Sequence, residues 1–390
     1  MSDASSITTN NREKEWAVLV ECASPQRGAP HLLSERLQGS FDWRELLIRA
    51  DQHGVLGLLA EQLKNLNPPP QAEIREAVRE WQRRQTVLTL SLTAEMFRLL
   101  EHFTALRIEV LVTKGPVLSV RCYGDPGMRQ YGDVDLIVRD KDIHRSTEAM
   151  IALGYTPKVP VTAIQAEKIP GEYVFRQPNA QVLIEFHTER TFRYHPRRLQ
   201  IENLFQRHAS VTIDGRDVPA LSLEDELILI CVHGAKHFWE RLMWIADVAA
   251  LISRTRVPDW DRVVAVAREV GAERILRLGL RLASDMLGTD LPVHLEPGIR
   301  SDRAVSKLAA QITRRLASCE PRDIGILQRA AFRVRMRGGL LPGAAYLFRL
   351  LLSPTEEDWT PGKEGNRSAF VDAVSRPFRL ARKHSRRSNN

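Results

Sequence analysis

The sequence predicts an α+β protein in which a small mixed β-sheet is flanked by an N-terminal helical segment and a C-terminal helical region. Three patterns lead to this prediction. Apolar residues recur at helical spacing from Gln71 to about Arg107, short β-branched and alternating runs follow, and helical periodicity returns after Ser222. We therefore expect four parts: a helical region at 1–106, an α/β core at 107–221, a helical region at 222–353 and a disordered basic tail at 354–390.

Local signals define the first elements. Residues 41–66 are expected to be helical up to a triple-proline break. Two compact β-branched runs, 108–112 and 133–138, are expected to be strands. Asp140 is placed to cap a helix that runs to about Leu153 and is closed by a glycine.

Two hairpins and a capped helix follow. One hairpin pairs 172–177 with 181–187, and the other joins 211–213 to 218–220 around an Asp-Gly turn. Ser222 and the aspartate three residues later predict a helix start. Later helices are expected at about 240–253, 259–270, 272–287, 303–317 and 324–336.

Composition bounds the class of protein. With 390 residues, 43% of them hydrophobic, the chain can bury a large core. Its four cysteines lie far apart with no C-x-x-C pair, which excludes a zinc ribbon and argues against a disulfide scaffold. No apolar run is long enough to span a bilayer, and the polar N-terminus shows no secretory signal, so we expect a cytoplasmic protein.

The net charge of +8 is concentrated at the C-terminus. Residues 376–390 carry six positive charges and no acid, which leaves only +2 for the rest of the chain. Such a tail could contact nucleic acid or an anionic surface through charge alone. The alternative is a disordered end that only aids solubility.

Two aspartates begin the second β-branched run. On a strand, Asp133 and Asp135 point to the same face, and the apolar residues 136–138 that follow indicate a buried strand. Adjacent buried carboxylates are unfavourable without a cation between them. Mg²⁺ is the natural partner because it prefers hard oxygen ligands, so we favour a metal site over two exposed acids at a strand start.

A third acid, Glu185, interrupts another apolar strand. If this strand lies beside the first, Glu185 faces the aspartate pair. Three carboxylates around two ions form the two-metal arrangement of phosphoryl and nucleotidyl transfer. His187 shares the face of Glu185 and could support the site, carry a proton or serve a structural role.

Lys114-Gly115 lies between the expected strand 108–112 and a short helical stretch. A glycine there lets a phosphate approach the backbone, and the amides of a helix start attract anions. The sequence contains neither G-x-x-x-x-G-K-[ST] nor G-x-G-x-x-G, so this is not a Walker or dinucleotide loop.

These residues resemble the bacterial uncharacterised nucleotidyltransferase family of the polymerase-β-type superfamily, over roughly 107–255. The resemblance is carried by Lys114-Gly115, Tyr123, Arg129, Gly132 to Val138, Gly154-Tyr155, Glu185 to His187, His233 to His237, Trp239, Arg241, Leu242, Trp244 and Asp247. Two features differ from the wider superfamily: Lys-Gly replaces its Gly-Ser or Gly-Gly, and the spacer before Asp133 is longer.

The resemblance implies a Mg²⁺-dependent enzyme that transfers a nucleoside monophosphate from an NTP to an acceptor hydroxyl and releases pyrophosphate. Asp133 and Asp135 would hold both ions, and Glu185 would complete the metal site and help deprotonate the acceptor. Lys114-Gly115 would cradle the phosphates, and Arg129 would neutralise them or brace the strand.

A second polar cluster follows in the helical half. His233 and His237 are four residues apart on one helix face, but Gly234 stands where a zinc-protease motif has its glutamate. Together with Lys236 and Arg241, these histidines are candidates for substrate contact; the alternative is a helical packing face.

Three functions remain open at this point. The acceptor of a nucleotidyltransferase would be a small molecule, a peptide or a protein. A non-catalytic nucleotide-binding or scaffold protein of a biosynthetic pathway would keep the fold without turnover. An RNA-directed nucleotidyltransferase is favoured only by the basic tail.

Overall fold

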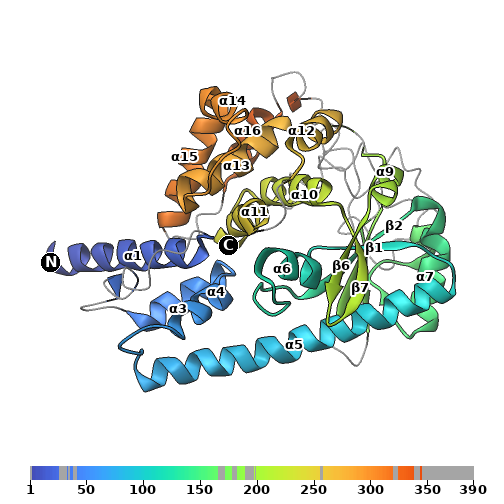
Figure 1. Ribbon diagram of the computed structural model, residues 1–390, viewed down its shortest axis with the longest axis horizontal. Helices are drawn as coiled ribbons and strands as arrows, with labels where there is room; N and C mark the ends of the chain where they lie inside the picture. Colours follow the sequence, from blue (N-terminus) through green and yellow to red (C-terminus); the bar gives the residue numbers. More distant parts are fainter. Residues whose placement is uncertain are drawn as a thin grey trace, which may run out of the picture.

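The structure is a computed structural model. It describes residues 2–25, 42–165, 172–177, 182–188, 199–254, 258–318 and 324–337, together with a few isolated positions (Figure 1). The expected basic tail at 354–390 lies outside the described residues, as does the turn of the first predicted hairpin.

A seven-stranded mixed sheet forms the core, which confirms the predicted fold class. Its strand order is β3-β4-β5-β2-β1-β7-β6. The β2/β5 and β1/β7 pairs are parallel, whereas the other four neighbouring pairs are antiparallel. The strands are β1 (Val110–Thr113), β2 (Asp133–Val138), β3 (Thr156–Pro157), β4 (Glu172–Arg176), β5 (Leu183–His187), β6 (Ala209–Ile213) and β7 (Arg216–Ala220).

Both predicted hairpins pair as expected. In β6/β7, Asp214 and Gly215 have φ values of +48° and +75°. Positive φ at both central residues is the requirement of a type I′ turn, which explains why an Asp-Gly pair occurs here. β4 and β5 are antiparallel neighbours, with Val174 opposite Glu185.

The N-terminal part is helical. It contains α1 (Ser2–Ala23), α3 (Trp43–Gln52), α4 (Leu56–Leu63) and the long α5 (Ala72–Ala105). Residues 41–66 are largely helical as expected, in two helices: α3 and α4 are separated because Gly54 adopts a φ of +72°, which ends the first helix.

The helices after the sheet agree closely with the predicted ranges. The long ones are α10 (Leu223–Lys236), α11 (Leu242–Arg254), α12 (Trp260–Glu269), α13 (Glu273–Leu287), α15 (Arg303–Ser318) and α16 (Ile326–Arg335). The remaining helix of this part, α14 (Glu296–Ser301), is short, and five short helices lie between strands: α6 (Gly115–Tyr123), η1 (Asp140–Asp142), α7 (Ile143–Ala152), α8 (Val161–Gln165) and α9 (Ile201–Gln206). The expected cap at Asp140 is wrong, because this residue begins η1 and α7 starts at Ile143 without a side-chain cap. Ser222 caps α10 as predicted, accepting a hydrogen bond from the Asp225 amide at 3.1 Å. No helix in the described ranges is long and apolar enough to cross a membrane.

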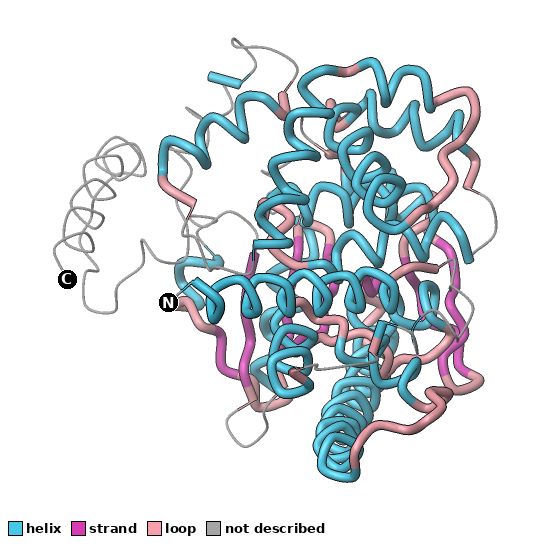
Figure 2. The backbone as a smooth tube through the Cα atoms, turned by 90° about the vertical axis from the view of Figure 1, so that its left-hand side faces the viewer, coloured by secondary structure: helices cyan, strands magenta, loops and turns pink. Residues whose placement is uncertain are grey.

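The two faces of the sheet have different partners. Val112, Leu136 and Phe186 point to one face and pack with α5, where Phe103 meets Phe186 edge-on at 5.9 Å between ring centroids. Leu111 and Ile137 point to the other face and join the apolar cluster of the helical half. In Figure 1, α5 runs along the bottom and α13 to α16 gather at the top; Figure 2 looks along α5.

A buried tryptophan fixes the corner between α10 and α11. Trp239 is 0% exposed, and its amide donates to the Gly234 carbonyl at 2.8 Å. A Cβ at Gly234 would lie 2.7 Å from the Trp239 ring, and a Cβ at Gly279 of α13 would lie 3.2 Å from it. Phe238 and Trp239 both have positive φ, which this close packing holds in place. The ring is therefore held between two helices that approach it through glycines.

Gly234→Ala should destabilise the protein by about 1–3 kcal/mol, because the added methyl group overlaps the Trp239 ring. The control is Gly298→Ala in α14, where a Cβ would meet no atom within 4 Å and alanine favours the helix by up to about 1 kcal/mol. Urea unfolding of both variants measures the difference; equal stabilities would contradict the packing described here.

Candidate active site

Sheet register brings the predicted acids together. Asp135 of β2 is opposite Glu185 of β5 in the parallel pair and opposite Thr113 of β1 on its other side. His187 is one pleat further along β5, and Asp133 is one pleat back along β2. Because alternate residues share a face, all five side chains lie on the face of the sheet that turns towards the helical half.

The tightest part of the cluster surrounds Asp135. Its Oδ1 atom accepts a hydrogen bond from Lys114 Nζ at 2.7 Å and lies 2.5 Å from His187 Nε2. His187 Nε2 is also 3.8 Å from Glu185 Oε2. Ligand atoms of Asp135, Glu185 and His187 all lie within 4.8 Å of one another. The sequence assigned a metal to Asp133, Asp135 and Glu185; among the described residues, the group whose ligand atoms converge has His187 in place of Asp133.

Burial and charge set the protonation of these acids. Asp135 is only 2% exposed, and although burial opposes ionisation, Lys114 and His187 hold its pKa well below the usual range. Burial and the charge of Asp135 raise the pKa of Glu185 to about 7. The same two causes raise the pKa of Asp133. If all three acids were ionised, their three negative charges would exceed the single positive charge of Lys114.

This donor set fits a divalent cation. Carboxylate oxygens are the ligands that Mg²⁺ prefers, and an imidazole nitrogen beside them is compatible with several divalent metals. The raised pKa values of Asp133 and Glu185 record repulsion among the acids as well as burial, and a cation between them would relieve that repulsion.

The loop at Lys114-Gly115 joins the acids to the start of a helix. Lys114 and Gly115 have φ values of +53° and +45°, and α6 begins at Gly115. A Cβ at Gly115 would lie 3.6 Å from the Asp133 carbonyl oxygen. The N-terminus of α6 therefore lies directly beside the carboxylates, where its free amides would face an anion bound near the same cation.

Arg129 is held in a buried network. Its side chain is 6% exposed, and its Nε donates to Asp247 Oδ2 of α11 at 2.9 Å. The Tyr123 hydroxyl donates to the other Asp247 oxygen at 3.0 Å, and the Arg129 amide donates to Ser119 Oγ at 3.1 Å. Of the two roles that the sequence suggested for Arg129, this geometry favours bracing, and phosphate contact stays a prediction.

Sequence reasoning did not identify Asp247 as the partner of Arg129. A second buried pair, between Arg121 of α6 and Glu226 of α10, was also missed. Together these pairs fasten α6 and the loop that leads to β2 onto α10 and α11. The signal for the first pair was present, since Tyr123, Arg129 and Asp247 all belong to the resemblance described above.

The second polar cluster lies on α10 and α11. His233 and His237 have ring centroids 4.7 Å apart, and Trp244 of α11 lies 5.5 Å from the first and 5.3 Å from the second. Burial and Lys114 lower the pKa of His233 strongly, while burial and Lys236 lower the pKa of His237 to about 4. Both imidazoles are therefore neutral at neutral pH.

Lys236 connects this cluster to the sheet. Its Nζ lies 3.5 Å from Glu172 Oε1 of β4, and Glu172 is opposite His187 in the sheet. The helix face of His233 and His237 therefore lies over the carboxylate face of the sheet. Arg241, the remaining candidate, is exposed and immediately precedes α11. Gly234, which replaces the glutamate of a zinc-protease motif, serves the packing of Trp239.

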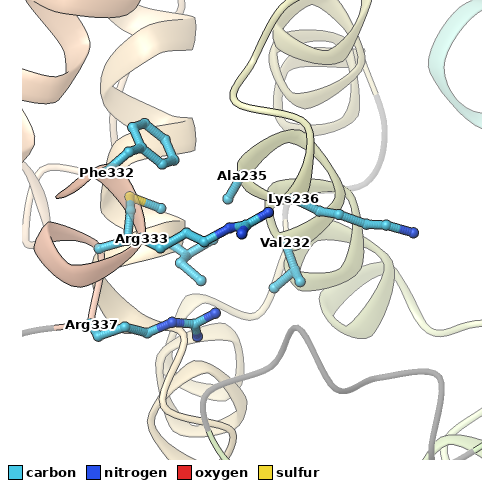
Figure 3. Close-up of a pocket in the computed structure, with 8 residues that line it drawn as sticks. Val232, Ala235, Lys236, Phe332, Arg333 and Arg337 are labelled. Carbon is cyan, nitrogen blue, oxygen red and sulfur yellow. The ribbon is translucent and has the colours of Figure 1, made fainter. Parts of the chain in front are cut away.

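An open pocket adjoins the other side of α10. In Figure 3 the Arg333 and Arg337 side chains of the α16 region extend towards α10, and Lys236 points away from them. The eight lining residues are Val232, Ala235, Lys236, Ile275, Phe332, Arg333, Met336 and Arg337.

The mixed sheet carries an acidic face beside a helix start, which is the arrangement that the sequence predicted for a nucleotidyltransferase. Residues 39–288, more than half of the chain, match the family described as "Uncharacterised nucleotidyltransferase". The chain therefore belongs to this family of nucleotidyltransferases, which confirms the predicted relationship at family level. The match extends well beyond 107–255 and takes in α3 to α5, α12 and α13.

Similarity to individual proteins is low. No curated protein matches the chain. A solved structure, an antigenic nucleotidyltransferase-like protein from Paracoccidioides brasiliensis, is similar at 15% identity with a TM-score of 0.33, over 56% of this chain and 92% of that one.

Asp247→Asn should destabilise the protein by about 3–5 kcal/mol, because it leaves the buried Arg129 guanidinium without a compensating charge. Adding Arg129→Met should recover part of the loss. Glu80→Gln, which removes an exposed acid between Arg83 and Arg84, is the control and should cost less than about 1 kcal/mol. Unfolding in urea measures all three, and equal costs for Asp247→Asn and Glu80→Gln would contradict the bracing role.

Proposed function

We propose that the protein is a Mg²⁺-dependent nucleotidyltransferase of the polymerase-β type that transfers a nucleoside monophosphate from an NTP to an acceptor hydroxyl. The observation that carries this proposal is the convergence of Asp135, Glu185 and His187 beside the N-terminus of α6. The family membership of the chain supports the reaction class.

Asp133, Asp135 and Glu185 are proposed to hold two Mg²⁺ ions, with His187 as a further donor. When bound, the ions would neutralise negative charge on the triphosphate, on the attacking oxygen of the acceptor and on the departing oxygen of pyrophosphate. Asp135 lies between Asp133 on its own strand and Glu185 on the next, so it would contribute to the site together with either of them.

The chain's own groups would position and polarise the substrates. Lys114 and the amides at the start of α6 would bind the phosphates. Glu185, with a pKa near 7, would accept the proton of the attacking hydroxyl. The bond from the acceptor oxygen to the α-phosphorus forms, and the bond from that phosphorus to the pyrophosphate oxygen breaks.

We propose a small molecule, a peptide or a protein as the acceptor. The RNA-directed alternative depends on the basic tail, which lies outside the described residues. Incubating the full chain with each α-labelled NTP, Mg²⁺ and cell extract tests the acceptor class, because the label would appear on the acceptor as pyrophosphate is released.

Asp133→Asn should lower the rate of pyrophosphate release by more than about 100-fold, because it removes a proposed metal ligand. Replacing a residue that only hydrogen-bonds to a metal ligand lowers activity by about 10- to 100-fold. Asp133 is the sharper target because it is half-buried, whereas Asp135 is 2% exposed and accepts the hydrogen bond of Lys114, so the fold should tolerate a change at Asp133 better. Asp261→Asn, at an exposed position of α12, is the matched control and should keep full activity.

The outcomes of this test separate the candidate functions. Activity that survives Asp133→Asn in a sample free of contaminating enzymes would refute the metal assignment. NTP binding without turnover in the unaltered protein, across all acceptor sources, would favour the non-catalytic scaffold.

Lys114→Met should raise the KM for NTP by about tenfold or more, because it removes a positive charge beside the proposed triphosphate site. Lys114→Arg keeps the charge and should recover part of the affinity. Steady-state kinetics at saturating Mg²⁺ measure both variants. Equal KM values for the methionine and arginine variants would show that the charge of this residue does not act on the substrate.

A further inference from the structure

A wall of three aromatic rings faces the carboxylates from the helical half. His233, His237 and Trp244, here called the ring wall, lie within 5.5 Å of one another by ring centroids. All three residues are half-buried rather than fully enclosed. The Trp244 ring is roughly perpendicular to that of His233, at 83°, and tilted by 35° from that of His237.

The ring wall adjoins the proposed triphosphate site. Lys236, on the same helix, reaches Glu172 on β4, the strand next to that of Glu185. The charge of Lys114 acts on both His233 and His237, which places them near the start of α6. Lys114 and Lys236 therefore both lie near the wall.

We propose that the ring wall binds the nucleobase of the NTP while the nearby lysines bind its phosphates, an assignment that rests on the proposed function. A nucleotide combines a flat uncharged ring with a polyanion. The wall offers uncharged ring faces, and Lys114 and Lys236 supply positive charge near it. Base–aromatic stacking of this kind contributes substantially to nucleic-acid binding and tolerates different bases.

The corner behind the ring wall is rigid. Trp239 packs against Gly234, which is the neighbour of His233, and this fixes the turn from α10 to α11. Asp247, three residues after Trp244, is held by Arg129 and Tyr123. Both helices that carry the rings are thus fastened close to the rings, so little ordering would accompany binding.

The neighbouring pocket is a weaker candidate for the base. Arg333 and Arg337 extend into it over apolar side chains, and Phe332, its aromatic lining residue, is 5% exposed. That pocket suits an anionic group better than a stacked base.

Calorimetric titration of the full-length protein with ATP and with inorganic tripolyphosphate, both with Mg²⁺, tests this assignment. Trp244→Leu should weaken ATP binding about 5- to 150-fold and change tripolyphosphate binding less than about twofold. Trp244→Phe keeps a ring and should retain most of the ATP affinity. His237→Leu keeps volume, loses the imidazole and should also weaken ATP selectively.

Trp260→Leu, at a half-buried tryptophan of α12, is the matched control and should alter neither ligand. If Trp244→Leu does not fold, the comparison of Trp244→Phe with His237→Leu still decides the question. Equal losses for ATP and tripolyphosphate, or no loss for ATP, would overturn the ring wall and leave the proposed function standing. If the unaltered protein binds tripolyphosphate as tightly as ATP, the ring wall is likewise overturned and the proposed function stands. If the unaltered protein binds neither ligand, the proposed function itself is refuted.

Discussion

The ion pair between Lys114 and Asp135 is the interaction on which the site depends. A carboxylate that is 2% exposed in the middle of a sheet is tolerated only with a charged or hydrogen-bonding partner, and Asp135 has both Lys114 and His187 on one oxygen. This pair ties the end of β1 to the centre of β2. It also fixes the backbone turn at Lys114, from which α6 begins.

Two further buried pairs extend this constraint into the helical half. Arg121 with Glu226 and Arg129 with Asp247 join α6 and the loop before β2 to α10 and α11. The sheet that carries the acids and the helices that carry the ring wall are consequently positioned by the same short segment of chain, residues 114–135. Charged groups at this interface are buried and paired, so they specify one relative placement of the two halves.

Much of the fold was predictable because its signals are local. The strands at 133–138, 172–176 and 183–187, the Asp-Gly turn and the Ser222 cap follow from alternation, turn chemistry and capping, which depend only on neighbours in the chain. Alternation also placed Asp133 and Asp135 on one face. Glu185 lies beside these aspartates because β2 pairs with β5. Local patterns in the sequence do not predict which strands pair, so the position of Glu185 could not be predicted from them.

The missed features are those decided by contacts between distant segments. No local pattern shows that Asp247 neutralises Arg129. The inclusion of His187 in the tightest cluster depends on how closely side chains of two strands approach. α1 was missed for another reason: its first half is Ser-, Thr- and Asn-rich and lacks an apolar stripe.

The packing of Trp239 between Gly234 and Gly279 makes these three positions interdependent. An indole fills the space that two missing Cβ atoms leave open, so α10 and α13 are spaced by its thickness. A larger side chain at Gly234 is compatible with the fold only if the tryptophan is replaced by a thinner one, whereas a Cβ at Gly279 would also lie 2.6 Å from Cys231 Sγ. Substitutions at the three sites should therefore be strongly non-additive, and a homologue that has lost one of them is expected to have changed the others as well.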